Sequence, residues 1–189
     1  KRYENKLEDI KKKYKALFYD ALDGIVVADI NSGKIVACNP AITRMTGKDM
    51  DDLVGTHQKY LHPHPDDSDE PTEEFRHHST DMVGEIIETK ILSSDGREID
   101  VEVVANIVEY NGGKYLQGVF RDITKRKKAI KELQTTHLAI ENSLDAIFVA
   151  DNEGNLTYAN PTSATLWGYD SVDELLCDRS TVFDYWVGE

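Results

Sequence analysis

The feature that most constrains this chain is an internal repeat. Residues 22–29 (LDGIVVAD) return about 120 residues later as residues 144–151 (LDAIFVAD). In both copies a glycine turn, an Asn-Pro pair and a further glycine follow in the same order. A period of this length corresponds to one small domain plus a connector. The sequence therefore predicts two copies of one module. Because the second copy lacks a counterpart of residues 66–122, we expect a fragment of a longer protein.

The composition argues against a nucleic-acid-binding protein. The chain carries 35 acidic and 22 basic residues, and its net charge of −13 repels phosphate backbones. Its two cysteines, Cys38 and Cys177, lie in different copies, which favours a reducing compartment over a disulfide within one domain. No apolar run reaches the ~18 residues that a membrane span needs. We expect a cytoplasmic fragment, and an upstream membrane anchor in the parent protein stays open.

Two helices with a heptad pattern are predicted to flank the first copy. In the first helix the apolar positions have the 3-4-3-4 spacing of a coiled-coil seam: Leu7, Ile10, Tyr14, Leu17 and Ala21. The second helix repeats this spacing: Ile130, Leu133, His137, Ile140 and Leu144. Proline is absent from this segment, so one continuous helix is predicted over residues 124–142. We expect a homodimer through these helices, supported by the flanking domains because each seam is short.

Between these helices the pattern is that of a small antiparallel sheet interrupted by helices, which defines an α+β fold. Strands are predicted at residues 24–30, 34–38, 85–92, 99–103 and 115–121. Asn39 and Pro40 predict a helix start, because the asparagine oxygen accepts hydrogen bonds from first-turn amides and proline has no amide to satisfy. That helix is expected to end at Gly47, and a further helix is predicted over residues 72–83.

The order of these motifs resembles the PAS domain family, the sensory modules of histidine kinases and cyclases. The resemblance is carried by residues 22–25 (LDGI), 39–41 (NPA), Gly47, 94–97 (SDGR) and 120–124 (FRDIT). The last of these is similar to the Asp-Ile-Thr signature that ends the final PAS strand and begins the signalling helix. The resemblance implies a five-stranded antiparallel sheet with helices on one side. The chain departs from the family at residues 125–128, where Lys-Arg-Lys-Lys replaces the usual Glu; we expect this to change the surface of the connector and not the fold.

The resemblance divides the chain into four parts. These are an amphipathic helix (1–19), a first PAS domain (20–124), a linker signalling helix (125–142) and the N-terminal part of a second PAS domain (143–189). It implies a sensory and dimerising module that passes a pocket-bound or upstream cue to the linker helix. Signal transmission is assigned to Asp122, Ile123, Thr124, Ile130, Leu133 and Ile140. The sequence carries no phosphate loop, nucleophile elbow or kinase signature. We therefore expect no enzyme activity here, and an output domain, that of a histidine kinase in a two-component system, elsewhere in the parent.

The pocket implied by the resemblance lies between the inner face of the sheet and the helices. Strand alternation and helix periodicity predict its lining: Ile25, Val27, Ile42, Met45, Leu61, Phe75, His78, Met82, Ile99, Val101, Val103 and Val119. A ligand is expected to touch Ile25, Met45, His78 and Met82. The alternative is equally open: these residues form a ligand-free core, and the domain is a structural spacer that only dimerises. Any domain of this size needs about this many buried apolar residues.

His78 is the candidate cofactor ligand. Five of the six histidines fall within residues 57–78, and helical spacing places His78 on the same face as Phe75 and Met82. An inward imidazole could ligate haem iron, as in oxygen-sensing PAS proteins. His78 lies only six residues before Gly84, closer than the ligand of those proteins, so a hydrogen-bonded histidine is favoured over haem.

Other cofactors are not expected. A photoactive flavin is set aside because the Asn-Cys-Arg-Phe motif of the light-sensing members is absent and Phe120 stands in the position of their glutamine. Residues 62–69 have metal-ligand side chains but lack the spacing of a calcium or zinc site, so a solvated loop and no metal are expected.

The second copy supplies only the first hairpin and the helices after it. A two-stranded hairpin is marginally stable on its own. Its apolar side chains would be left without a cover: Phe148, Leu156, Tyr158, Leu166 and Trp167. We expect a second chain or the first module to cover this half-domain.

Overall fold

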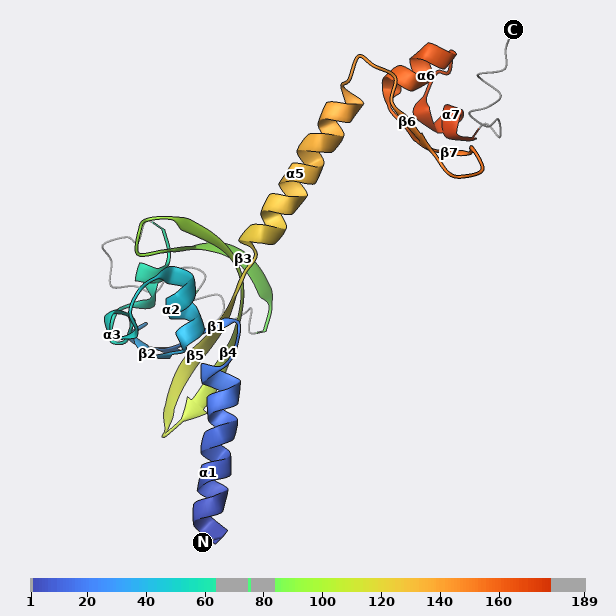
Figure 1. Ribbon diagram of the computed structural model, residues 1–189. Coiled ribbons are helices and arrows are strands. Elements are labelled where there is room, and N and C mark those ends of the chain that lie inside the picture. Colours follow the sequence, from blue (N-terminus) through green and yellow to red (C-terminus); the bar gives the residue numbers. More distant parts are fainter. Residues whose placement is uncertain (1, 64–74, 76–83, 178–189) are drawn as a thin grey trace. The chain divides into compact units, whose positions relative to one another are not determined.

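The computed structural model describes residues 2–63, 75 and 84–177, and the chain divides into two compact units, Lys1–Lys127 and Lys128–Glu189 (Figure 1). The first unit contains a five-stranded antiparallel sheet of order β2-β1-β5-β4-β3. Its strands are β1 (Gly24–Asp29), β2 (Ile35–Cys38), β3 (Ile86–Leu92), β4 (Glu98–Tyr110) and β5 (Gly113–Asp122). The predicted α+β class and PAS fold are confirmed.

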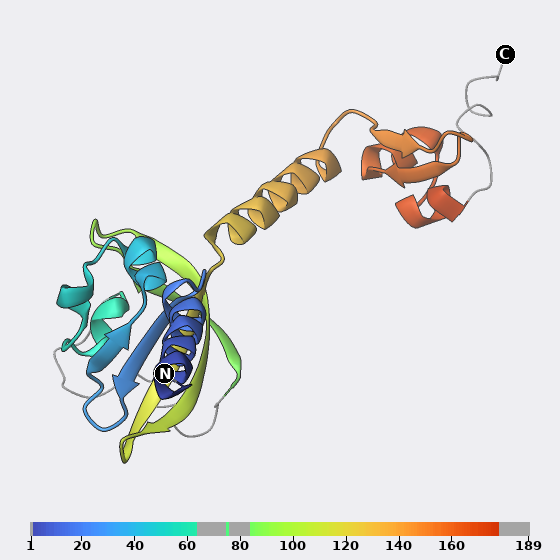
Figure 2. The same cartoon turned by 60° about the horizontal axis from the view of Figure 1, so that its bottom comes forward.

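Strand β4 is much longer than the predicted 99–103 stretch. Its C-terminal half continues to pair with β5 as far as the pair Tyr110 and Gly113. Asn111, in the turn between the two strands, adopts a positive φ of 49°. Asparagine tolerates this left-handed conformation better than most residues. Figures 1 and 2 show the β4–β5 hairpin extending beyond the shorter strands β1 and β2.

Short helices cover the inner face of the sheet. They are α2 (Pro40–Thr46), α3 (Met50–Leu53) and the 3-10 helix η2 (Gln58–Leu61). Ile42, Leu53 and Leu61 are buried there against strand residues such as Val101 and Phe120, and this cluster is the main core. The predicted helix 72–83 lies outside the described residues, apart from Phe75.

Helix α2 begins and ends as the sequence predicts. The Asn39 side chain accepts a hydrogen bond from Ile42 N at 3.2 Å, and Gly47 closes the helix with a left-handed φ of 66°. The second module repeats this arrangement between Asn160 and Gly168. The Asn-Pro start and the glycine stop are therefore local signals that act in the same way in both copies.

The outer face of the sheet is approached by the N-terminal helix. Helix α1 (Arg2–Tyr14) continues into a π-helical turn, η1 (Lys15–Tyr19). Tyr14, Leu17 and Phe18 line a shallow hollow together with Ile25 and Val27 of β1. Phe18 is buried, and its ring stacks on that of Tyr14 at a centroid distance of 5.3 Å. The C-terminal end of this N-terminal helical segment thus packs against the outer face of the sheet.

The linker is one continuous helix, α5 (Thr124–Glu141), as predicted (Figure 1). The second unit then contains the hairpin β6 (Phe148–Ala150) and β7 (Leu156–Ala159) and the helices α6 (Pro161–Trp167) and α7 (Val172–Cys177). Leu144 lies beyond the end of α5 and is exposed, so it does not extend the helical seam. Within the described ranges, no helix combines the length and apolar character needed to cross a bilayer.

The half-domain builds a small cluster of its own. Leu175, Ala159 and Ala164 are buried, and Phe148 and Trp167 pack beside them with ring centroids 5.0 Å apart. Phe148 and Trp167 are therefore half-buried within their own module, whereas Leu166 is exposed. A covering surface for this module stays a prediction.

Candidate functional site

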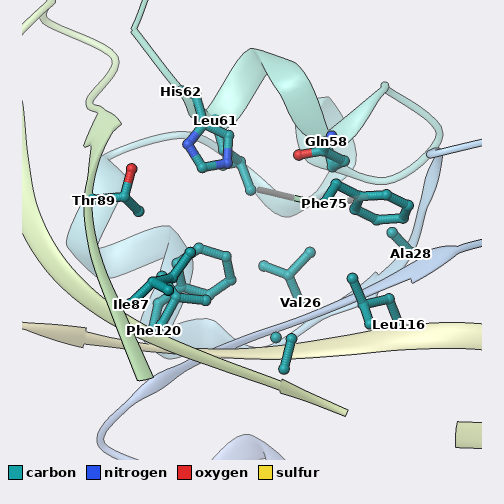
Figure 3. Close-up of a pocket in the computed structure, with 13 residues that line it drawn as sticks. Val26, Ala28, Gln58, Leu61, His62, Phe75, Ile87, Thr89, Leu116 and Phe120 are labelled. Carbon is teal, nitrogen blue, oxygen red and sulfur yellow. The ribbon is translucent and has the colours of Figure 1, made fainter. Parts of the chain in front are cut away.

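The inner face of the sheet carries a small, partly open cavity of about 50 Å³. Apolar side chains from the sheet and from Phe75 form most of its wall, and the polar groups of Gln58, His62 and Thr89 lie on one side of it (Figure 3). Its lining is Val26, Ala28, Gln58, Leu61, His62, Phe75, Ile87, Thr89, Val103, Ala105, Leu116, Gly118 and Phe120. Gln58 is buried at this wall.

The structure brings only some of the predicted pocket residues together. Leu61, Phe75 and Val103 line the cavity. Four others belong to or pack against the neighbouring core cluster: Ile42, Met45, Ile99 and Val101. His78 and Met82 lie outside the described residues. The interpretation of His78 as a pocket residue stays a prediction.

The predicted face of β1 is wrong. Ile25 and Val27 lie on the outer face, in the hollow beside α1, and Val119 pairs directly with Ile25 and shares that face. The inner face instead carries Gly24, Val26 and Ala28. A Cβ on Gly24 would lie 2.9 Å from Ile42 Cδ1, so the absence of a side chain allows α2 to pack closely.

The inner face of β1 was assigned wrongly because the strand is apolar on both faces. A pattern of alternating apolar and polar residues is then absent and cannot show which side chains point inward. The glycine at position 24 was the available signal. Val103 points to the inner face, and its cross-strand partner Phe120 therefore does so too. Gly118 lies two residues before Phe120 on the same face, so its partner Val26 also points inward.

The size of the cavity limits what it can hold. A water molecule occupies about 30 Å³ of liquid, whereas pockets for drug-sized ligands measure roughly 300–1,000 Å³. The described cavity therefore has room for one or two waters, or for a ligand of a few atoms. Gln58 and His62 were not predicted as pocket residues, because no helix or strand was predicted between Gly47 and residue 72.

The junction between sheet and linker helix occupies three residues. Strand β5 ends at Asp122 and α5 begins at Thr124. The Asp122 carboxylate accepts from Thr124 N at 2.8 Å, which starts the helix. Ile123 is buried, and its amide donates to Asp100 O at 2.9 Å. The Asp-Ile-Thr motif thus attaches the start of the helix to the end of β5 and to β4.

Arg126 and Lys127, which we call the basic clamp, tie the first turn of α5 to the sheet. Arg126 Nη2 lies 2.6 Å from Glu102 Oε1 and 3.2 Å from Glu88 Oε1. Lys127 Nζ lies 3.0 Å from both Glu88 Oε2 and Asp100 Oδ1. Hydrogen bonds to Glu88 and then to Asp100 raise the pKa of Lys127 above its ordinary value. The residues that depart from the family pattern therefore contact strands β3 and β4.

The clamp resolves a repulsion within the sheet. Glu88 and Glu102 are direct cross-strand partners, and like charges in that position destabilise a sheet. Arg126 bridges the two carboxylates, and together with Lys127 it offsets their negative charge. Sequence reasoning missed this, because it could not see that residue 126 reaches this cross-strand pair.

A second ion pair ties the incoming segment to the last strand. Arg121 of β5 contacts Asp23 through two bonds, Nη2 to Oδ2 at 2.8 Å and Nε to Oδ1 at 3.3 Å. Asp23 directly precedes β1 and follows η1. The N-terminal helix and the start of α5 are thus connected through one end of the sheet.

Comparisons with known proteins agree with this architecture. A family model described as a PAS domain matches residues 22–125, and a second PAS domain model matches residues 134–189. The chain belongs to the PAS domain family.

Solved structures share the fold. The PAS domain of an HTR-like protein from Haloarcula marismortui is 26% identical with a TM-score of 0.53, and the match covers 65% of this chain and 98% of that one. An RNA-binding Light-Oxygen-Voltage receptor is 22% identical with a TM-score of 0.52, over 68% of this chain and 37% of the receptor. A domain of a sensory box sensor histidine kinase/response regulator from Geobacter sulfurreducens is 26% identical with a TM-score of 0.47, over 60% of this chain and 95% of that domain. No curated protein sequence matches the chain significantly.

Proposed function

We propose that this chain is the sensory and dimerising relay of a signal-transduction protein, in which a change in the first PAS sheet moves helix α5. The observation that supports this most directly is the junction. Strand β5 lies between β1 and β4 and runs into α5 with one residue between them. The basic clamp then links the same helix to β3 and β4. A shift of the strands is therefore applied to the first turn of the helix.

The parent that we propose is a histidine kinase. The PAS modules that this chain resembles serve as sensory regions of such kinases, and a helix that leaves the module suits an output domain further along the parent. We place this region in the cytoplasm, a location that suits two free cysteines, Cys38 and Cys177. The net charge of −13 supports a partner other than nucleic acid.

The cavity favours a relay that holds no large ligand. At about 50 Å³ it is several times smaller than ligand pockets of roughly 300–1,000 Å³, which supports a cue that enters through α1 or a ligand of a few atoms. The competing candidate is a haem-binding sensor. An absorption spectrum and the native mass of the purified protein separate the two: a visible haem band and a native mass that exceeds a whole multiple of the 21.4 kDa polypeptide by the mass of a haem would favour the haem sensor.

The Arg126→Ala variant tests the relay at the clamp. It removes the bridge between Glu88 and Glu102 and loosens the first turn of α5, which then keeps only the Lys127 ion pairs to the sheet. We expect amide hydrogen exchange in residues 124–129 to become about two- to fivefold faster, because exposed ion pairs contribute up to ~1 kcal/mol. High ionic strength should produce a similar change in the parent chain.

The matched control for this test is Lys128→Ala. Lys128 pairs only weakly with Glu132, four residues along the same helix, at 3.9 Å. This variant removes one positive charge from α5 but leaves the clamp intact, so its exchange should match that of the parent. Equal exchange in Arg126→Ala and Lys128→Ala would show that the clamp does not hold the helix to the sheet.

A further inference from the structure

A buried asparagine in the first module contacts the helix that enters it. The Asn39 side chain is 0% exposed. Its Nδ2 donates to Phe18 O, in η1, and to Asp23 O, both at 3.0 Å. Its Oδ1 accepts from Ile25 N at 2.8 Å and from Ile42 N at 3.2 Å. One side chain thus connects the incoming helix, the first strand and the start of α2.

The second module repeats this arrangement around Asn160, which is also 0% exposed. Its Nδ2 donates to Ile140 O at 3.1 Å and to Asp145 O at 2.9 Å. Its Oδ1 accepts from Ile147 N at 2.9 Å and from Ser163 N at 3.0 Å. The incoming helix here is α5, and Ile140 is its penultimate residue.

These hydrogen bonds hold the end of α5 in a defined position. The last carbonyls of a helix lack an intrahelical partner, and Asn160 satisfies one of them from within the module. Both amide protons and the oxygen of the Asn160 side chain form hydrogen bonds. Because the side chain is fully buried, water cannot replace one of these partners without disrupting the local structure. Two further contacts act beside it: Tyr158 Oη donates to Glu141 Oε1 at 2.6 Å, and Thr162 Oγ1 donates to Ser143 O at 2.6 Å.

We infer that Asn160 joins α5 and the second module into one rigid body and is the positioning residue through which a movement of α5 reaches that module. Residues Lys128–Glu189 form one compact unit, which agrees with this joint. Asn39 has the same role for the helix that enters the first module. The inference rests on the proposed relay for its signalling meaning, but the rigidity of the joint is measurable on its own.

Residual dipolar couplings of backbone amides, measured by NMR on the whole chain, test the joint. In the parent, residues 130–140 of α5 and residues 147–176 of the second module should fit one common alignment tensor. Asn160→Asp keeps the oxygens that accept from Ile147 and Ser163 but removes the amide donors. We expect the two segments to require separate tensors in this variant, with the order of the module falling to about half that of the helix.

Asn39→Asp is the matched control. It makes the same chemical change in the first module and should leave the shared tensor of α5 and the second module intact. Separate tensors in the parent chain, or a shared tensor in Asn160→Asp, would overturn the inference.

A second variant covers a failure to fold. Asn160→Ser keeps an N-cap oxygen while removing both donated bonds, and it should also separate the tensors. If both variants unfold the second module, Asn160 is a residue required for folding and the inference is wrong. This test and the test of the relay can give different answers. If Arg126→Ala behaves like Lys128→Ala while α5 and the second module share one tensor, the proposed function is rejected and the rigid joint is retained.

Discussion

The Asn39→Ala variant is expected to lose about 3–5 kcal/mol of the free energy of unfolding of the first PAS domain. Asn39 is fully buried and makes four hydrogen bonds to main-chain groups. Alanine leaves those groups buried without this partner, at about 1–3 kcal/mol for each group that finds no substitute. It also removes the N-cap of α2, which contributes about 1 kcal/mol.

Urea unfolding measures this loss, because the two modules can be followed separately. Both tryptophans, Trp167 and Trp186, belong to the second module, so their fluorescence reports on that module while circular dichroism reports on both. The fluorescence transition should not move. Asn31→Ala, in the exposed turn after β1, is the control and should change the unfolding free energy by less than about 0.5 kcal/mol. A similarly small loss in Asn39→Ala would contradict the hydrogen-bond account.

The double variant Leu7→Glu, Ile10→Glu is expected to abolish the proposed homodimer and to raise its dissociation constant by at least about 100-fold. The two side chains are 54% and 56% exposed in the single chain and lie on the apolar seam of α1. Burying each in a dimer would contribute on the order of 1–2 kcal/mol, and a glutamate there would have to be desolvated instead. Sedimentation equilibrium of the parent and the variant gives the two dissociation constants.

The control for this variant must carry the same charge. Asn5→Glu with Lys12→Gln also makes the net charge of α1 more negative by two, but on the side of the helix away from the seam. It should dimerise as the parent does, apart from a small effect of charge. Equal weakening by both double variants would mean that net charge, and not the seam, controls association. A parent that stays monomeric at high protein concentration would reject the dimer itself.

The local signals of the sequence predicted much of the fold. The Asn39 and Asn160 caps, the glycine stops and the uninterrupted α5 follow from propensity and hydrogen bonding within a few residues. The repeat itself revealed the two modules. The Asp-Ile-Thr signature located the junction, and the structure shows its physical basis in the Asp122 to Thr124 bond and the buried Ile123.

The features that sequence reasoning missed depend on partners far apart in the chain. The face of β1 was assigned wrongly because Ile25, Val26 and Val27 are all apolar, and only pairing with β5 decides which points inward. Arg126 was predicted only to change the surface of the connector, but its partner Glu102 lies on another element. The donors of Asn39 were invisible for the same reason: an N-cap signal describes the oxygen of the side chain and says nothing of its amide protons.

The central claim is that a change in the first PAS sheet moves α5, and the distance between the two α5 helices of a dimer measures this directly. Spin labels attached to the Lys131→Cys variant would report this distance by double electron–electron resonance. The exposed Cys177 is replaced by Ser in this background. Cys38 can remain, because it is buried and burial raises the pKa of its thiol. Ala105→Val then perturbs the sheet at the wall of the cavity.

We predict that Ala105→Val shifts or broadens the distance distribution between the labels, and that adding Arg126→Ala weakens this response. Circular dichroism should show that each variant remains folded. Identical distributions in the parent and in Ala105→Val, with both proteins folded and dimeric, would contradict the coupling of sheet and helix.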